Sequence, residues 1–201
     1  MRDVFIVGLG LTPVKEHWGL SLRQLGTQAI WAALNDAKLE TADSLVVGNM
    51  LSGQICGQEN LGTLLADEAG LLPIEAIKVE AACGSGGAAV RQAALAVAAG
   101  ASEVAIAVGV EKMTDVPADI VTAGLARASD QEFEAAFGLS FVGMAALLTQ
   151  RYLHESGRVR ADFAPFVINA HNNAITAGHA MFHSAISAEQ FARSPSVASP
   201  L

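Results

Sequence analysis

VEAACGSGGAAV, at residues 79–90, joins two segments of different character. An apolar run at 74–79 precedes it and an alanine-rich run at 88–99 follows, which predicts a strand, a glycine-rich turn and a helix. Cys83 is expected in that turn, where free backbone N–H groups and the helix dipole favour thiolate over thiol. The glycines beside it let a substrate carbonyl approach the backbone. The local pattern fits a nucleophile and a small inert core cysteine equally well.

The composition predicts a folded protein with an aliphatic core. Of 201 residues, 52% are hydrophobic and 16% are charged, so disorder is not expected. The formal net charge of −8 argues against a nucleic-acid-binding surface. No metal-ligand spacing links Cys56 and Cys83 to each other or to a histidine pair, so we expect no metal site. Reduced cysteines, and apolar runs too short for a signal peptide or a membrane span, predict a soluble cytoplasmic protein.

Strand and helix patterns alternate through the first half of the chain. Apolar runs predict strands at 4–8, 44–50, 74–79 and 104–110. Helical spacing predicts helices at 22–37 behind Ser21 as N-cap, at 61–69 after a glycine-containing loop, and at 88–99. This order predicts an α/β fold with a mostly parallel sheet and helices on both faces. Cys83 then lies at the carboxyl end of a strand, where open α/β sheets place their ligands.

The pattern changes after residue 114. Proline and glycine residues interrupt short polar stretches up to residue 139, and no strand pattern appears there. Helical spacing returns at 141–154 and 162–174, with Asp162 as the expected cap of the second helix. Ser187 and Gln190 form a capping box that opens a last short helix. We therefore predict an incomplete α/β core at 1–114 and a largely helical loop or lid domain at 115–201.

Two segments resemble the nucleophile region of the thiolase superfamily: EAACGSGGAAVRQAALAVAAG at 80–100 and EVAIAVGVEKMTD at 103–115. In thiolases each of two similar halves has a βαβαβαββ core, and a loop domain that covers bound coenzyme A is inserted in the first half. Residues 4–201 resemble that first half through its fourth strand, followed by most of the loop domain. The later segments are similar to archaeal and sterol-carrier-protein-like thiolases, because residues 141–143 read Phe-Val-Gly where the common biosynthetic type has His-Met-Gly.

The resemblance implies an acetyl-CoA C-acyltransferase of lipid metabolism. Cys83 would be acylated by an acyl-CoA to give an acyl-enzyme intermediate. Its backbone N–H would form half of an oxyanion hole, a donor whose removal typically costs about a hundredfold or more in rate. The reaction would be thiolytic cleavage or Claisen condensation, with coenzyme A as a substrate and no permanently bound cofactor. The family's activating histidine and second cysteine belong to the second half of the fold, and this chain has neither at a matching position.

The histidines of this chain are not expected to replace that base. Gly178-His179 is similar to the first two residues of the family's Gly-His-Pro motif, but Ala180 follows and the segment aligns with the loop domain. We expect surface or capping roles for His171, His179 and His183. His17 and His154 are expected to face solvent.

Three further residues are expected to have structural or positioning roles. Cys56 lies in a loop that in the family approaches the partner subunit, so a structural role is expected. Glu111 and Met113 follow the fourth predicted strand and are expected to position the Cys83 loop. The resemblance places coenzyme A contacts within 115–183, where the candidates for its phosphates are Arg127, Arg151, Arg158 and Arg160.

Two other functions stay open on the sequence alone. A ketoacyl-carrier-protein synthase or hydroxymethylglutaryl-CoA synthase would share the fold and the cysteine, although the Glu-Lys-Met triplet at 111–113 favours a thiolase. A catalytically silent thiolase-like subunit would bind an acyl-CoA or a partner, with Cys83 as a relic. In each case we expect a homo-oligomer or a complementary chain with the second half. The strand at 104–110 would otherwise keep an unpaired edge, and the 88–99 helix is apolar nearly all round.

Overall fold

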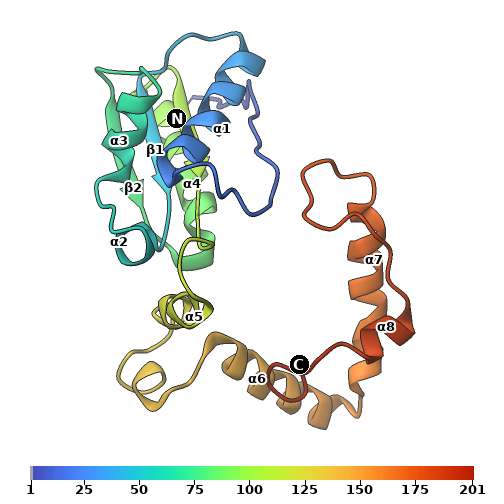
Figure 1. Cartoon of the computed structure of the whole chain (residues 1–201). Helices are drawn as coiled ribbons and strands as arrows, with labels where there is room; N and C mark the ends of the chain where they lie inside the picture. The colour runs from blue at the N-terminus through green and yellow to red at the C-terminus, as the bar shows by residue number, and fades with distance from the viewer. Residues whose placement is uncertain (1) are drawn as a thin grey trace. The chain divides into compact units, whose positions relative to one another are not determined.

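The structure is a computed structural model that describes residues 2–201 (Figure 1). The described chain divides into two compact units. The first comprises residues 2–12 and 16–121, and the second comprises residues 13–15 and 122–201. The sheet and Cys83 belong to the first unit, whereas the second unit is built from helices and loops.

The first unit follows the predicted alternation of strands and helices. Its elements are α1 (Leu22–Ala37), β1 (Ser44–Gly48), α2 (Ser52–Ile55), α3 (Leu61–Glu68), β2 (Glu75–Val79), the 3-10 turn η1 (Ala82–Gly84), α4 (Ser85–Ala99) and β3 (Ala105–Gly109). Ser21 caps α1 as predicted. Its hydroxyl accepts the Gln24 N–H at 3.2 Å, and the Gln24 side chain accepts the Ser21 N–H at 2.9 Å.

Within residues 2–201 the strands form one parallel sheet in the order β2-β1-β3. Gly48 at the end of β1 is level with Val79 on β2 and with Gly109 on β3. Every residue of β1 is buried, because β1 is the central strand and both faces of the sheet are covered. The carboxyl ends of all three strands therefore meet at one edge, and the predicted parallel sheet is confirmed.

Helices cover both faces of the sheet, as predicted (Figure 1). On one face, α1 and α3 contribute Ile30 and Leu65 to a large core that includes Leu45 of β1. On the other face, α4 places the small residues Ala89 and Ala93 on the sheet. Such short side chains let the α4 backbone approach the strands closely.

The apolar run at 4–8 forms no strand in the structure, so that prediction is wrong. Phe5 and Ile6 are 77% and 79% exposed. The described sheet has unpaired outer edges at β2 and β3, but the run pairs with neither of them. The backbone lies against α1 instead: a Cβ atom on Gly8 would be only 2.4 Å from the carbonyl oxygen of Ala33.

The second unit is helical, as predicted. Its elements are α5 (Ala118–Ala126), which starts in the first unit, η2 (Ala135–Phe137), α6 (Phe141–Ser156), η3 (Arg160–Phe163), α7 (Ala164–Ala174) and α8 (Ala188–Ala192). The capping box of Ser187 and Gln190 is confirmed, with bonds of 2.8 and 3.1 Å. None of the described helices is both long enough and apolar enough to cross a membrane.

Asp162 does not cap α7, contrary to the prediction. It lies inside η3, where its carboxylate accepts the N–H of Val159 at 3.0 Å. α7 begins two residues later, with Pro165 in its first turn. Proline is tolerated there because the N–H that it lacks would have no partner within the helix.

Candidate active site

Cys83 lies in the turn between β2 and α4, as the sequence predicts. It is the middle residue of η1, and its side chain is exposed. Because β2 is level with the other strands, the turn places the thiol at the carboxyl edge of the sheet. Ligands of open α/β sheets bind at this edge.

Hydrogen bonds hold the backbone of the Cys83 turn from both sides. The Ser85 hydroxyl accepts the N–H of Ala81 at 2.9 Å and donates to the carbonyl of Ala82 at 2.7 Å. The Glu80 carboxylate accepts the N–H of Ala82. Ala82 has a φ of 48°, a left-handed conformation that costs a non-glycine residue about 1 kcal/mol or more. Cys83 thus directly follows a strained residue that neighbouring side chains hold in place.

Glycine residues let the first turn of α4 sit against the strand ends. A Cβ atom on Gly48 would lie 2.3 Å from the carbonyl oxygen of Ser85. A Cβ atom on Gly109 would lie 3.4 Å from the Cα of Gly86, whereas one on Gly87 would meet no atom within 4 Å. The close packing under the Cys83 turn therefore depends on Gly48.

Glu111 contacts the segment that follows β1 rather than the Cys83 loop itself. Its carboxylate accepts the N–H groups of Met50 at 3.0 Å and Leu51 at 3.1 Å, and the side-chain amide of Asn49 at 2.9 Å. Asn49, whose side chain is buried, is not among the residues predicted to act at the site. An asparagine directly after the apolar run at 45–48 is the signal that could have found it, since a buried amide needs several partners.

The residues after Glu111 lead from β3 to the edge of a pocket. Lys112 is buried, with 4% exposure, and forms an ion pair with Asp115. Asp115 lines the pocket. Met113 is 37% exposed, and its expected role in positioning the Cys83 loop stays a prediction.

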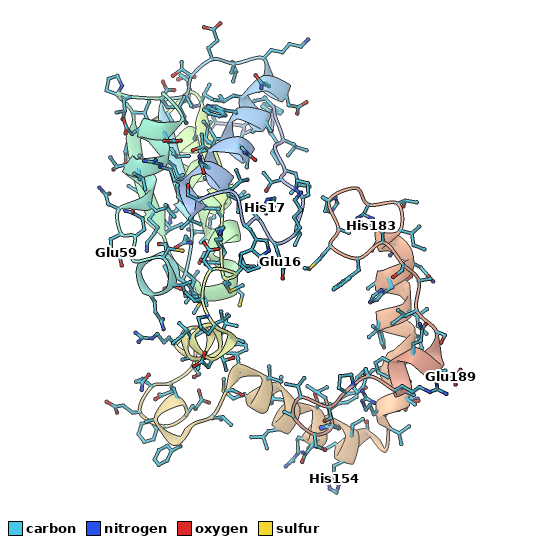
Figure 2. The ribbon with its side chains drawn as sticks, viewed as in Figure 1. Glu16, His17, Glu59, His154, His183 and Glu189 are labelled. Carbon is cyan, nitrogen blue, oxygen red and sulfur yellow. The ribbon has the colours of Figure 1, made fainter. Side chains whose placement is uncertain are left out.

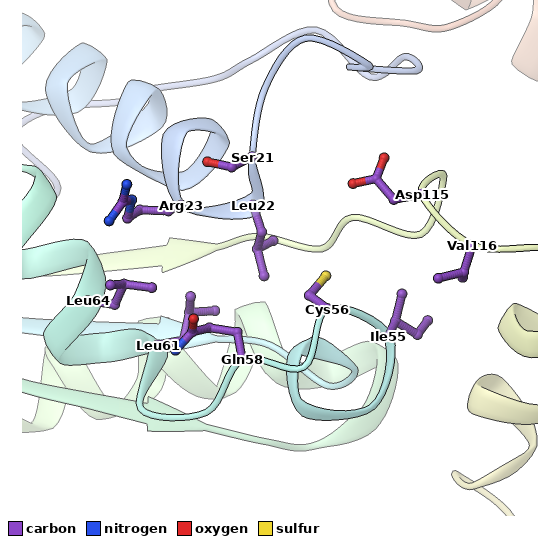
Figure 3. Close-up of a pocket in the computed structure, with 10 residues that line it drawn as sticks. All are labelled: Ser21, Leu22, Arg23, Ile55, Cys56, Gln58, Leu61, Leu64, Asp115 and Val116. Atoms are coloured by element: carbon purple, nitrogen blue, oxygen red, sulfur yellow. The ribbon is translucent and has the colours of Figure 1, made fainter.

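This open pocket, of about 450 Å³, contains the second cysteine (Figure 3). Burial raises the pKa of the Cys56 thiol, and the negative charges of Glu111 and Asp115 raise it further. A thiol that stays protonated is a poor nucleophile. The lining residues come from α1, α2, α3 and the loops after α2 and β3: Ser21, Leu22, Arg23, Ile55, Cys56, Gln58, Leu61, Leu64, Asp115 and Val116.

Four of the five histidines belong to the second unit. Figure 2 shows His154 at the end of α6 and His183 in the loop after α7, on separate elements. His171 lies on α7 with Nδ1 3.0 Å from the carbonyl oxygen of Ser184, and His179 follows the same helix. His17 lies in the loop before α1. Across the described residues, no three His, Cys, Asp or Glu side chains are arranged to hold a metal ion.

Two of the four candidate arginines have partners within the second unit. Arg151 forms an ion pair along α6 at 2.6 Å, and Arg160 donates to the Ser194 hydroxyl at 2.7 Å. Arg127 and Arg158 form no ion pair with any residue in the range 2–201. The two unpaired guanidinium groups are thus the ones free to meet an anion.

Comparisons with known proteins match nearly the whole chain. It is 42% identical over 203 residues to the acetyl-CoA acetyltransferase of Methanothermobacter thermautotrophicus. It is 44% identical over 205 residues to the acetyl-CoA acetyltransferase of Methanocaldococcus jannaschii. Both alignments cover 100% of this chain but only 52% and 51% of those proteins. The chain therefore spans about half the length of these relatives.

The fold is also found among solved structures. An aldolase described as Ltp2-ChsH2(DUF35) aldolase matches with a TM-score of 0.73 and 27% identity, over 98% of this chain and 50% of that one. The family model described as the thiolase N-terminal domain matches residues 4–196. With the Cys83 turn at the carboxyl edge of a parallel sheet, these matches lead to one conclusion: the chain belongs to the thiolase N-terminal domain family.

Proposed function

We propose that this chain is the nucleophile-bearing part of an acyl-CoA acyltransferase, with Cys83 as the residue that becomes acylated. The observation that carries the proposal is the exposed Cys83 thiol in a tightly held turn at the start of α4. The identity of 42–44% to two acetyl-CoA acetyltransferases supports it. Cys56 is the weaker candidate because the pKa of its thiol is raised.

The chemistry begins with attack of the Cys83 thiolate on the thioester carbon of an acyl-CoA. The new C–S bond gives a tetrahedral intermediate whose negative oxygen accepts a hydrogen bond from the Cys83 backbone N–H. The bond to coenzyme A then breaks, and the departing thiolate takes up the proton that the Cys83 thiol lost. In the second step the acyl group passes to coenzyme A or to the α-carbon of another acyl-CoA. A base for that carbon is expected from outside this chain.

Coenzyme A is proposed to contact residues 115–183, chiefly through Arg127 and Arg158. These two arginines have no ion-pair partner among the described residues, so their charges are available to phosphate groups. Replacing either by alanine should weaken binding about tenfold, the usual size for a charge-assisted hydrogen bond. Arg151→Ala is the matched control, since Arg151 already pairs within α6. Equal losses in all three variants would contradict this assignment.

A partner is proposed to cover the outer face of α4 and the free edge of β3. Val90 and Leu95 on α4 are 53% and 38% exposed, and in the described sheet β3 pairs with β1 alone. Exposed apolar surface and an unpaired strand edge both favour association. The partner would be a second copy or a complementary chain. If the partner is a second copy, sedimentation of the chain alone should give a mass above 20.7 kDa, and an active monomer would contradict the proposal for either partner.

Transfer of an acetyl group tests the role of Cys83 directly. The chain is incubated with acetyl-CoA, digested and mapped by mass spectrometry. The peptide that contains Cys83 should gain one acetyl group. Cys83→Ser should abolish the label without loss of the fold, and Cys56→Ser should keep it. An acetyl group that persists in Cys83→Ser, or its absence from the folded wild-type chain, would overturn the proposal.

A second candidate function is an aldolase, because an aldolase structure superimposes on 98% of the chain. Cleavage of an aldol breaks a carbon–carbon bond beside a carbonyl and requires no acylated thiol. The same experiment separates the two candidates. An acetyl group on Cys83 supports the acyltransferase, whereas an unlabelled but folded chain favours the aldolase.

A further inference from the structure

At the carboxyl edge of the sheet, a hydrogen-bond network is centred on Asn49, which is only 1% exposed. The side-chain Nδ2 donates to the carbonyl of Val110 at 2.8 Å and to the carboxylate of Glu111 at 2.9 Å. The side-chain Oδ1 accepts the N–H of Ser52 at 2.9 Å. Both ends of the amide are thus engaged, and they join the segment after β1 to the segment after β3.

Glu111 completes this network from the β3 side. Besides Asn49, its carboxylate accepts two successive backbone N–H groups, those of Met50 and Leu51. All of these partners are donors, so the position suits a carboxylate and suits a neutral amide poorly. The segment 49–51 is therefore fixed by a charged acceptor.

The same segment supports the Cys83 turn at both of its ends. The backbone N–H of Asn49 donates to the carbonyl of Val79, the last residue of β2, at 3.2 Å. The neighbouring Gly48 lies directly under Ser85, where a Cβ atom would be 2.3 Å from the carbonyl oxygen. A shift of residues 48–49 would therefore displace the turn where it leaves β2 and where it enters α4.

We infer that Asn49 and Glu111 are positioning residues for Cys83: they fix the backbone on which the nucleophile turn rests. This inference rests on the proposed role of Cys83. Neither residue contacts substrate in this proposal. Their effect is on the placement of the thiol and of the backbone N–H that meets the developing oxyanion, where small misplacements are costly.

A matched control exists at the opposite edge of the sheet. There the Asp43 carboxylate accepts the N–H groups of Glu103 at 2.8 Å and Val104 at 2.9 Å, and so also joins β1 to β3. If joining the two strands were all that mattered, Asp43→Asn and Glu111→Gln would affect the Cys83 turn alike.

The test compares Glu111→Gln, Asn49→Leu and Asp43→Asn in the 201-residue chain. Amide hydrogen exchange at residues 81–86 reports the turn whether or not the chain is active. Exchange there should speed up about tenfold in Glu111→Gln and Asn49→Leu, and should stay unchanged in Asp43→Asn. Unchanged exchange in the folded Glu111→Gln variant, or equal acceleration in Asp43→Asn, would overturn the inference.

A chemical readout separates placement from general loosening. Alkylation by iodoacetamide needs only an exposed thiol. Acetylation by acetyl-CoA also needs the thiol and the backbone N–H to be correctly placed relative to each other. The ratio of Cys83 acetylation to Cys83 alkylation should therefore fall about tenfold in Glu111→Gln, with the ratio in Asp43→Asn unchanged. An unchanged ratio in Glu111→Gln contradicts the inference. A wild-type chain that is never acetylated contradicts the proposed function instead, and the exchange experiment still decides the role of Glu111.

Discussion

At its amino end the sheet is tied together by Asp43, and at its carboxyl end by Glu111. Each carboxylate accepts two successive backbone N–H groups and so joins β1 to β3. The ties differ in their neighbours. Asp43 is an exposed loop residue. Glu111 instead shares its site with the buried Asn49, whose backbone N–H donates to Val79, the last residue of the strand before the Cys83 turn. The same kind of hydrogen bonding therefore joins the strands at the amino end and, we propose, also positions the nucleophile at the carboxyl end.

The largest expected effect is that of Gly48→Ala at the carboxyl end. The added methyl group would lie 2.3 Å from the Ser85 carbonyl oxygen, and backbone atoms on both sides cannot yield easily. We expect a loss of about 2 to 4 kcal/mol in the free energy of unfolding, measured by urea titration.

The control for Gly48→Ala is Gly87→Ala, in the first turn of α4. A methyl group there would meet no atom within 4 Å, and alanine favours a helix over glycine. This variant should be neutral or more stable. If the two variants lost equal stability, close packing under the Cys83 turn would not be the reason.

Asn49→Ala against Ser44→Ala compares polar residues at the two ends of β1. The Asn49 side chain forms three hydrogen bonds, and Asn49→Ala leaves their other partners unsatisfied. This change should lower the free energy of unfolding by about 2 to 3 kcal/mol. Ser44→Ala removes one bond, that of 2.9 Å to the Ser102 hydroxyl, and should cost about 1 kcal/mol. Thermal and urea unfolding of both variants measure the difference. A larger cost for Ser44→Ala would reverse the comparison between the two ends.

The two cysteines at the carboxyl end should differ in reactivity at neutral pH. Cys83 is exposed, whereas burial raises the pKa of the Cys56 thiol and keeps it protonated. Iodoacetamide followed by peptide mapping should label Cys83 about tenfold faster or more. Cys56 should begin to react only in alkaline solution. Faster labelling of Cys56 at neutral pH would show that its surroundings do not suppress the thiolate.

The smallest expected effect is the pH dependence contributed by Asp43. Hydrogen bonds from the N–H groups of Val104 and Glu103 lower the pKa of its carboxyl group. A lowered pKa in the folded state adds stability that is present above the unfolded value of about 3.9 and is lost as the pH falls through the folded value. Asp43→Asn should therefore flatten the loss of stability below about pH 4. If stability falls in the same way with pH in the wild-type chain and in Asp43→Asn, this prediction is wrong.

The sequence predicted elements whose signals are local. The turn that carries Cys83 was predicted from an apolar run that ends at a glycine-rich segment. The cap at Ser21 was predicted from its place directly before a helical pattern, and the cap at Ser187 from the spacing of Ser187 and Gln190. These features need no knowledge of distant residues, and the structure confirms all three.

Features that depend on distant partners were missed or wrongly predicted. The run at 4–8 has the composition of a strand, but composition does not say whether a run pairs with a sheet edge or packs on a helix, and this run lies against α1. Proline and glycine residues predict interruptions between residues 115 and 139, yet Pro117 immediately precedes α5, a place that proline tolerates. The hydrogen-bond partners of Asn49 include Val110 and Glu111, about sixty positions away, so no local pattern identifies them.

Ala82, the left-handed residue before Cys83, has a consequence for tuning the protein. Glycine at this position would relieve the steric cost of the folded turn, but it would also enlarge the set of conformations open to the unfolded chain. The two contributions are similar in size and opposite in sign, so overall stability should hardly change. Without a Cβ atom, however, the backbone at this position would rotate between conformations more freely. Position 82 therefore offers a way to adjust how rigidly the thiol is presented, separately from how firmly the domain is folded.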